Sequence, residues 1–256
     1  MNLTNQQKGI AFAFIGILMI TPDTLFIRLV SISSWDLVFY RGFIPFLCLL
    51  IGLLFVYKKN FLKVIYATGV AGLVYAIIIA LMNVSFIISI ENTNVANTLI
   101  MLSLAPFTAA IMSSIFLKEH PKSRTWFAMI LCFLFVLFIF YDSYEHKRLY
   151  GDLFGLITAL LVGASSVVIR YAKSVSFLPS LLLGKLITTL IALFFIQSIY
   201  LEGIDIYLII IMGIFFVTLP LTFITLAPRY IPAHECQLFF ILETALGPLW
   251  VWLVIN

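Results

Sequence analysis

Long apolar runs follow one another through almost the entire chain, and they limit the folds that it can adopt. A helix that crosses the hydrocarbon core of a bilayer needs about 20 mostly apolar residues. Strands of a membrane barrel are about half that length and alternate apolar with polar residues, so continuous runs indicate helices. The nine runs that we identify are residues 9–29, 35–57, 64–89, 95–117, 125–141, 153–172, 177–200, 206–228 and 234–255. The sequence therefore predicts an all-α integral membrane protein with nine transmembrane helices.

The composition excludes a soluble protein. Hydrophobic residues make up 63% of the chain and charged residues only 10%, against roughly 25% charged in a soluble domain. The basic residues lie scattered in short loops, so the net charge of +4 does not indicate a nucleic-acid partner. Lipid is the solvent that suits such a chain, and the bilayer is therefore the expected surrounding.

The cysteines and histidines indicate neither a metal site nor a cofactor. The cysteines, interpreted as packing residues, are Cys48, Cys132 and Cys236. The histidines stand near the ends of predicted helices without metal-ligand spacing, and they are His120, His146 and His234. The sequence also has no G-x-S-x-G, phosphate-loop or H-E-x-x-H motif, so we expect a protein that is not an enzyme.

The charges of the loops predict the orientation. Loops on the side of the N-terminus contain Lys8, Lys58, Lys59, Lys63, Lys118, Lys122, Arg124, Arg170, Lys173 and Arg229. Loops on the opposite side contain only Arg28, Lys147 and Arg148. Because cytoplasmic loops are enriched in Lys and Arg, we expect a multi-pass protein of the inner (cytoplasmic) membrane with a cytoplasmic N-terminus.

The chain contains an internal repeat. The first predicted helix has Gly9 and Arg28 nineteen residues apart, and the sixth has Gly151 and Arg170 at the same spacing, 142 residues later. If each repeat has five helices, the odd number inserts the two repeats into the membrane with opposite orientations. Arg28 would then lie at the outer end of its helix and Arg170 at the inner end.

The fourth and ninth predicted helices support the same repeat. At an offset of 138 residues, Asn94 corresponds to Pro232, and Glu119 would correspond to position 257. The predicted fold is therefore a ten-helix inverted-repeat (5+5) bundle whose tenth helix is absent from this chain. Residues 1–146 would form the first repeat, and residues 147–256 would form the second repeat with four helices.

Several motifs in this order resemble the EamA family of the drug/metabolite transporter superfamily. The second predicted helix contains FYRGFIPF around Arg41. The fourth has a small, polar beginning at residues 94–97, a proline at Pro106 and a closing acid at Glu119. The ninth contains Glu243 within ILETALGP. The resemblance covers the whole chain up to the missing tenth helix.

This resemblance implies a secondary transporter. A family member is expected to move small metabolites, such as amino acids or other small organic solutes, across the cytoplasmic membrane by alternating access, most often as export, with protons as a possible coupling ion. Two alternatives stay open: an uptake carrier for an organic solute, and a non-transporting or degenerate membrane scaffold.

Ionisable side chains inside the predicted helices need a physical reason, because burying a charge in hydrocarbon costs at least a few kcal/mol. Asp23 and Arg41 each lie about six residues from the outer end of their helices, so we predict that they form an ion pair. The pair would belong to a substrate or proton pathway, or it would only hold two helices together. In another alternative, Arg41 extends toward the headgroups, as Lys185 of the seventh helix would extend toward the cytoplasm.

Glu243 lies near the centre of the ninth predicted helix, about ten residues from either end. At that depth it must be protonated, paired or in contact with water. It is either the group that exchanges a proton for substrate or a structural residue with a buried partner.

The remaining candidates for the substrate pathway are uncharged. Asn83, Asn97 and Ser103 offer neutral hydrogen bonds to a solute, although bonds between helices are the commoner use of such residues. Pro106 interrupts its helix and would expose backbone carbonyl groups to a cavity, or it is a tolerated kink. Glycines at Gly69, Gly72, Gly151, Gly155 and Gly163 are expected to permit close packing of helices.

Overall fold

The computed structural model describes residues 4–119, 123, 126, 127, 130, 134 and 148–255. Every regular element in this part of the chain is a helix, as the sequence predicts. Most of the fifth predicted span, residues 125–141, lies outside the described residues, as do His120, His146 and Cys132.

Seven helices or end-to-end series of helices are long and apolar enough to span a membrane among the described residues. In the N-terminal half the elements are α1 (Asn5–Ile20), α2 (Asp23–Leu29), α3 (Ser34–Tyr57), η1 (Lys58–Asn60), α4 (Phe61–Ala67), α5 (Gly69–Asn92), α6 (Val95–Leu102) and α7 (Ala105–Phe116). In the C-terminal half they are α9 (Leu149–Tyr171), α10 (Leu178–Leu193), α11 (Asp205–Ile211), η2 (Met212–Thr218), α12 (Leu219–Leu226), η3 (Ala227–Arg229), α13 (Ala233–Leu238) and α14 (Phe240–Ile255). α10 is apolar but has only 16 residues, so the number of nine spans stays a prediction.

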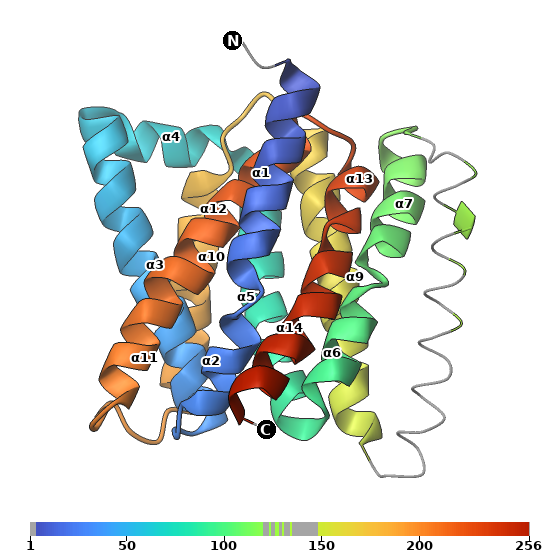
Figure 1. Ribbon diagram of the computed structural model, residues 1–256. Helices are drawn as coiled ribbons and strands as arrows, with labels where there is room; N and C mark the ends of the chain where they lie inside the picture. Colours follow the sequence, from blue (N-terminus) through green and yellow to red (C-terminus); the bar gives the residue numbers. More distant parts are fainter. Residues whose placement is uncertain are drawn as a thin grey trace.

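Two predicted boundaries are wrong. The helix predicted over 64–89 begins at Gly69, whose φ of +57° breaks the chain away from α4. α4 lies across the end of the bundle that holds the N-terminus (Figure 1). The helix predicted over 177–200 ends at Leu193, because Asp36 of α3 accepts hydrogen bonds from the backbone N–H groups of residues 197 and 198 at 2.8 and 3.3 Å.

The two halves of the chain pack against each other throughout the bundle. α5 packs on α9, α3 on α10, α1 on α12 and α7 on α13, while α14 packs on both α2 and α6. Figure 1 shows α1, α12 and α14 crossing in front of α5, with α3 and α7 to either side. One apolar core with residues from both halves therefore surrounds the centre of the bundle.

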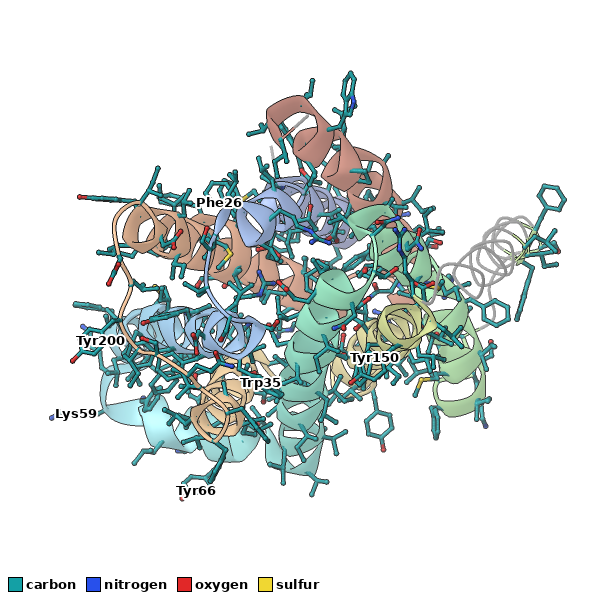
Figure 2. The ribbon with its side chains drawn as sticks, turned by 90° about the horizontal axis from the view of Figure 1, so that it is seen from below. Phe26, Trp35, Lys59, Tyr66, Tyr150 and Tyr200 are labelled. Atoms are coloured by element: carbon teal, nitrogen blue, oxygen red, sulfur yellow. The ribbon has the colours of Figure 1, made fainter. Side chains whose placement is uncertain are left out.

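Large apolar and aromatic side chains cover the outside of the bundle. Figure 2 shows Tyr66 and Tyr200 pointing away from it at the periphery, and both residues are at least 80% exposed. A soluble protein does not expose so many large hydrophobic residues in contiguous patches. The protein is therefore a multi-pass membrane protein whose outer surface suits lipid.

Glycines on α9 allow its close approach to the first half. A Cβ atom added at Gly163 would lie 2.7 Å from the carbonyl oxygen of Ala105 and 2.9 Å from the backbone nitrogen of Ala109. Gly151, Gly155 and Gly72 have similar close neighbours, as predicted. Gly69 has nothing within 4 Å, so the packing role predicted for it is wrong, and its positive φ explains the glycine instead.

We expect Gly163→Ala to lower the free energy of unfolding by about 1–3 kcal/mol, because backbone atoms of α7 cannot move aside cheaply. The matched control is Gly52→Ala on α3, where a new Cβ would meet nothing within 4 Å. The control should keep or slightly raise stability, because alanine favours helix over glycine by about 1 kcal/mol. Unfolding of the purified protein in detergent measures both, and equal stabilities would contradict the packing argument.

Candidate functional site

A break between α1 and α2 places Asp23 inside the bundle. Pro22 has no backbone N–H, so the helix is interrupted there. The break is held by Thr21, whose hydroxyl donates to the carbonyl oxygen of Leu18 at 3.0 Å and accepts from the indole of Trp250 at 3.1 Å. Asp23 then begins α2 as a fully buried carboxylate.

Arg41 of α3 is the partner of Asp23. Its Nη1 donates to Asp23 Oδ1 at 2.5 Å, and both side chains are at most 5% exposed. The Arg41 guanidinium also lies 5.5 Å from the centre of the Phe86 ring and contacts the sulfur of Met212 at 3.8 Å. The predicted ion pair is confirmed, and the alternative in which Arg41 extends toward the headgroups is wrong.

Lys185 of α10 lies directly behind this pair. It is fully buried, and its Nζ donates to Asn83 Oδ1 at 2.9 Å and to the backbone carbonyl oxygen of Arg41 at 3.3 Å. Asn83 in turn donates from its Nδ2 to the carbonyl oxygen of Ile79 at 2.8 Å. Lys185 therefore does not extend to the cytoplasm, and it fixes the side chain of Asn83.

Glu243 completes a group of four buried ionisable residues. It lies near the start of α14, is 2% exposed, and interacts electrostatically with both Asp23 and Arg41. No hydrogen bond to Glu243 is found among the described residues, and its Oε2 is buried without a partner. Asp23 Oδ2 is buried without a partner as well. The structural partner that the sequence left open for Glu243 is thus not present in the described part of the chain.

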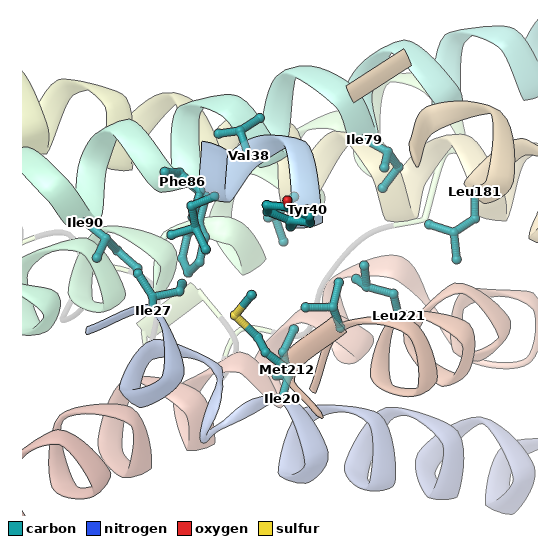
Figure 3. Packing of buried hydrophobic residues seen from close by; sticks show 14 of the residues in the cluster. Ile20, Ile27, Val38, Tyr40, Ile79, Phe86, Ile90, Leu181, Met212 and Leu221 are labelled. Carbon is teal, nitrogen blue, oxygen red and sulfur yellow. The ribbon is translucent and has the colours of Figure 1, made fainter. Parts of the chain in front are cut away.

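A cavity with about 740 Å³ of empty space connects these residues. Asp23, Arg41 and Glu243 line its inner part, and Ile169 and Pro228 line it close to the end of the bundle where the N-terminus lies. Much of its wall is apolar, with Ile20, Ile79, Phe86 and Leu221 among the side chains shown in Figure 3. Helices of both halves contribute, so the cavity lies between the two halves.

Half of the residues predicted for the substrate pathway line this cavity. They are Asp23, Arg41, Asn83 and Glu243. Lys185 lies behind the wall, whereas Asn97, Ser103 and Pro106 lie on α6, α7 and the turn between them, away from the cavity. Asn97 donates to the Thr93 hydroxyl at 3.3 Å, and the Ser103 hydroxyl donates within its own turn to Ile100 at 2.5 Å.

Several polar residues of the wall were not predicted. Tyr75 and Thr225 share a hydrogen bond of 2.8 Å across the two halves, and Thr158 and Gln237 also line the cavity. A spacing of three residues joins Gln237, Phe240 and Glu243, which places them near one face of the ninth helix. That spacing is a signal in the sequence that identifies Gln237. No comparable signal distinguishes Tyr75 or Thr225 from other polar residues in apolar helices.

Two arginines that correspond in the predicted repeat make matching contacts at opposite ends of the bundle. Arg28 donates to the carbonyl oxygen of Ile90 at 2.6 Å, and Arg170 donates to that of Pro228 at 3.5 Å. The arginines are 142 residues apart and the two acceptors 138, the same offsets as in the sequence comparison. Arg170 also pairs with Glu119 at 2.8 Å.

Removing one member of the Asp23–Arg41 pair should destabilise the fold more than removing both. Asp23→Asn leaves the Arg41 charge without its buried partner, at a cost of about 3–5 kcal/mol. We expect Asp23→Asn/Arg41→Gln to recover part of this loss in detergent unfolding. Glu202→Gln, an exchange of the same kind at an exposed loop residue, is the control and should be neutral. A double variant as unstable as the sum of the two single variants would exclude an energetic coupling within the pair.

Comparisons with known proteins agree with this fold. The EamA-like transporter family matches residues 7–141, just over half of the chain. A solved structure described as "Crystal structure of protein" superposes with a TM-score of 0.70 at 14% identity, over 98% of this chain and 88% of that chain, which is a likeness of fold alone. No curated protein sequence matches significantly. From the family match, we conclude that the chain belongs to the EamA-like transporter family and is a membrane transporter.

Proposed function

We propose that this transporter is a secondary carrier that exports small organic solutes across the cytoplasmic membrane by alternating access. The observation that supports this most is the cavity between the two halves, which holds a buried ion pair and a carboxyl group without a partner. Binding at a site between two repeats is the arrangement by which such carriers work. Export, and amino-acid-like solutes as cargo, follow from the family resemblance.

The two halves would act as inverted repeats, residues 1–146 and 147–256. The matching contacts of Arg28 and Arg170 at opposite ends support this assignment. In a carrier of this kind, one repeat rocks against the other, and the bound solute is exposed first on one side and then on the other. The contacts at one end of the bundle would open as those at the other end close.

Glu243 is the group that we assign to proton coupling. A buried carboxyl group without a partner is most stable when it is protonated, or when a bound cation replaces the proton. Competition of proton and solute for one group couples their movements without a further device. Asp23 and Arg41 satisfy each other and would hold α2 and α3 in place around the site.

Loss of the Glu243 carboxylate should abolish coupling to protons. In liposomes containing the purified protein, we expect Glu243→Gln to reduce pH-gradient-driven flux of a transported solute at least tenfold, while exchange of labelled for unlabelled solute persists. Glu202→Gln is the matched control, because Glu202 is exposed in a loop away from the cavity.

Flux that follows the gradient unchanged in Glu243→Gln would show that another group binds the proton. Gradient-driven flux only into vesicle lumens equivalent to the cytoplasm would identify an uptake carrier. Absence of flux for every solute tested would favour a scaffold.

We also propose that the N-terminus is cytoplasmic. Lys58, Lys59, Lys63 and Lys173 belong to segments at the end of the bundle where the N-terminus lies (Figure 1). That distribution is the one that cytoplasmic loops show.

Cysteine labelling tests this orientation. In a variant whose three native cysteines are replaced by alanine, a membrane-impermeant maleimide added to intact cells should label Tyr200→Cys and not Lys59→Cys. Both native side chains are exposed, at opposite ends of the bundle. Opening the cells should make Lys59→Cys reactive, and the reverse pattern would invert the topology.

A further inference from the structure

The cavity presents more unused hydrogen-bond acceptors than donors. Glu243 Oε2, Asp23 Oδ2 and Gln237 Oε1 are all buried oxygens without a partner. Each belongs to a side chain that lines the cavity and is at most 2% exposed. A buried polar atom that stays unsatisfied costs about 1–3 kcal/mol, so a ligand that donates to these oxygens gains that energy on binding.

The serine hydroxyl groups of the wall add to this surplus. Ser165 and Ser166 line the cavity, and their hydroxyls donate to the carbonyl oxygens of Val162 and Gly163 at 2.7 and 2.9 Å. A hydroxyl has one proton to donate and two lone pairs to accept with. Because the proton of each serine is used within its own helix, only acceptor positions remain for a ligand.

The cationic side chains have few donors left for a ligand. Arg41 donates to Asp23 and contacts Met212, and Nε is its one buried nitrogen without a partner among the described residues. Lys185 does not line the cavity and donates to Asn83 and to the Arg41 carbonyl oxygen. The two positive charges thus offset the buried carboxylates, but their hydrogen-bonding capacity is directed mainly into the wall.

We propose that the solute carries an ammonium group, which binds between Asp23 and Glu243 and donates to their free oxygens. A protonated primary amine has three N–H donors, and charge-assisted hydrogen bonds to carboxylates are about twice as strong as neutral ones. The remainder of the solute is apolar, to match Ile79, Phe86 and Phe240 of the wall. This inference rests on the proposed function, because it names the class of solute for the same cavity.

A carboxylate on the solute opposes binding. It would face the oxygens of Asp23, Glu243 and Gln237, and its best partner, Arg41, is already paired. Breaking that pair leaves a buried charge unsatisfied, which is strongly unfavourable. Within the broad class of amino-acid-like solutes, the cavity therefore selects amines over amino acids and over organic acids.

The experiment uses four probes with the same phenyl ring: 2-phenylethylamine, phenylalanine, 3-phenylpropionate and 2-phenylethanol. Binding to the purified full chain in detergent is measured by isothermal titration calorimetry at neutral pH. We expect 2-phenylethylamine to bind at least tenfold more tightly than the other three. Glu243→Gln, which keeps the shape of the side chain, should weaken the amine by a factor of roughly 10–100, as loss of a charged hydrogen bond predicts.

The controls separate binding in the cavity from partition into the micelle and from unfolding. Glu202→Gln should bind the amine as the parent protein does, because both meet the same detergent. Thermal unfolding confirms that each variant is folded before titration. Equal binding of all four probes, tighter binding of phenylalanine or 3-phenylpropionate, or an amine affinity unchanged in Glu243→Gln would overturn the assignment.

Flux assays distinguish failure of this inference from failure of the proposed function. Glu243-dependent flux of a carboxylate solute, without binding of amines, would overturn the amine assignment and leave the carrier intact. Tight, Glu243-dependent binding of the amine without flux of any solute would support the site and contradict transport.

Discussion

Burial of four ionisable side chains in one membrane-embedded core is the constraint on which the rest of the structure depends. Each charge in hydrocarbon is costly, and it is tolerated only where other groups compensate it. Asp23 and Arg41 compensate each other directly, while Lys185 is held by Asn83 and by a backbone carbonyl oxygen. These contacts join α2, α3, α5 and α10, so helices from both halves are held around the cavity by the groups that make it functional.

The fold could be predicted from the sequence further than the site could. Length and hydrophobicity identify spans such as α3 and α9 almost residue by residue, because the bilayer sets the length of a spanning helix. The end of α10 could not be predicted, since residues 194–200 are as apolar as a helix and leave it because of contacts to Asp36 and Tyr40 of α3.

In the site, charge was the informative property. Asp23, Arg41 and Glu243 could be identified one by one because a buried charge needs an explanation, and the Asp23–Arg41 pair followed from their equal depth. Neutral polar residues offer no such criterion. Ser103 and Asn97 have the same chemistry as Ser165 and Asn83, and which of them line the cavity depends on the rotation of each helix about its axis.

The contacts of Arg28 and Arg170 have a consequence for how this family can diverge. Their acceptors are backbone carbonyl oxygens, of isoleucine at position 90 and of proline at position 228. Two side chains with nothing in common thus serve equally, because every residue type supplies the same carbonyl group. Substitutions at the acceptor positions leave these bonds intact, and only loss of the arginine removes them. Natural variation is therefore expected to be free at one partner of each bond and restricted at the other.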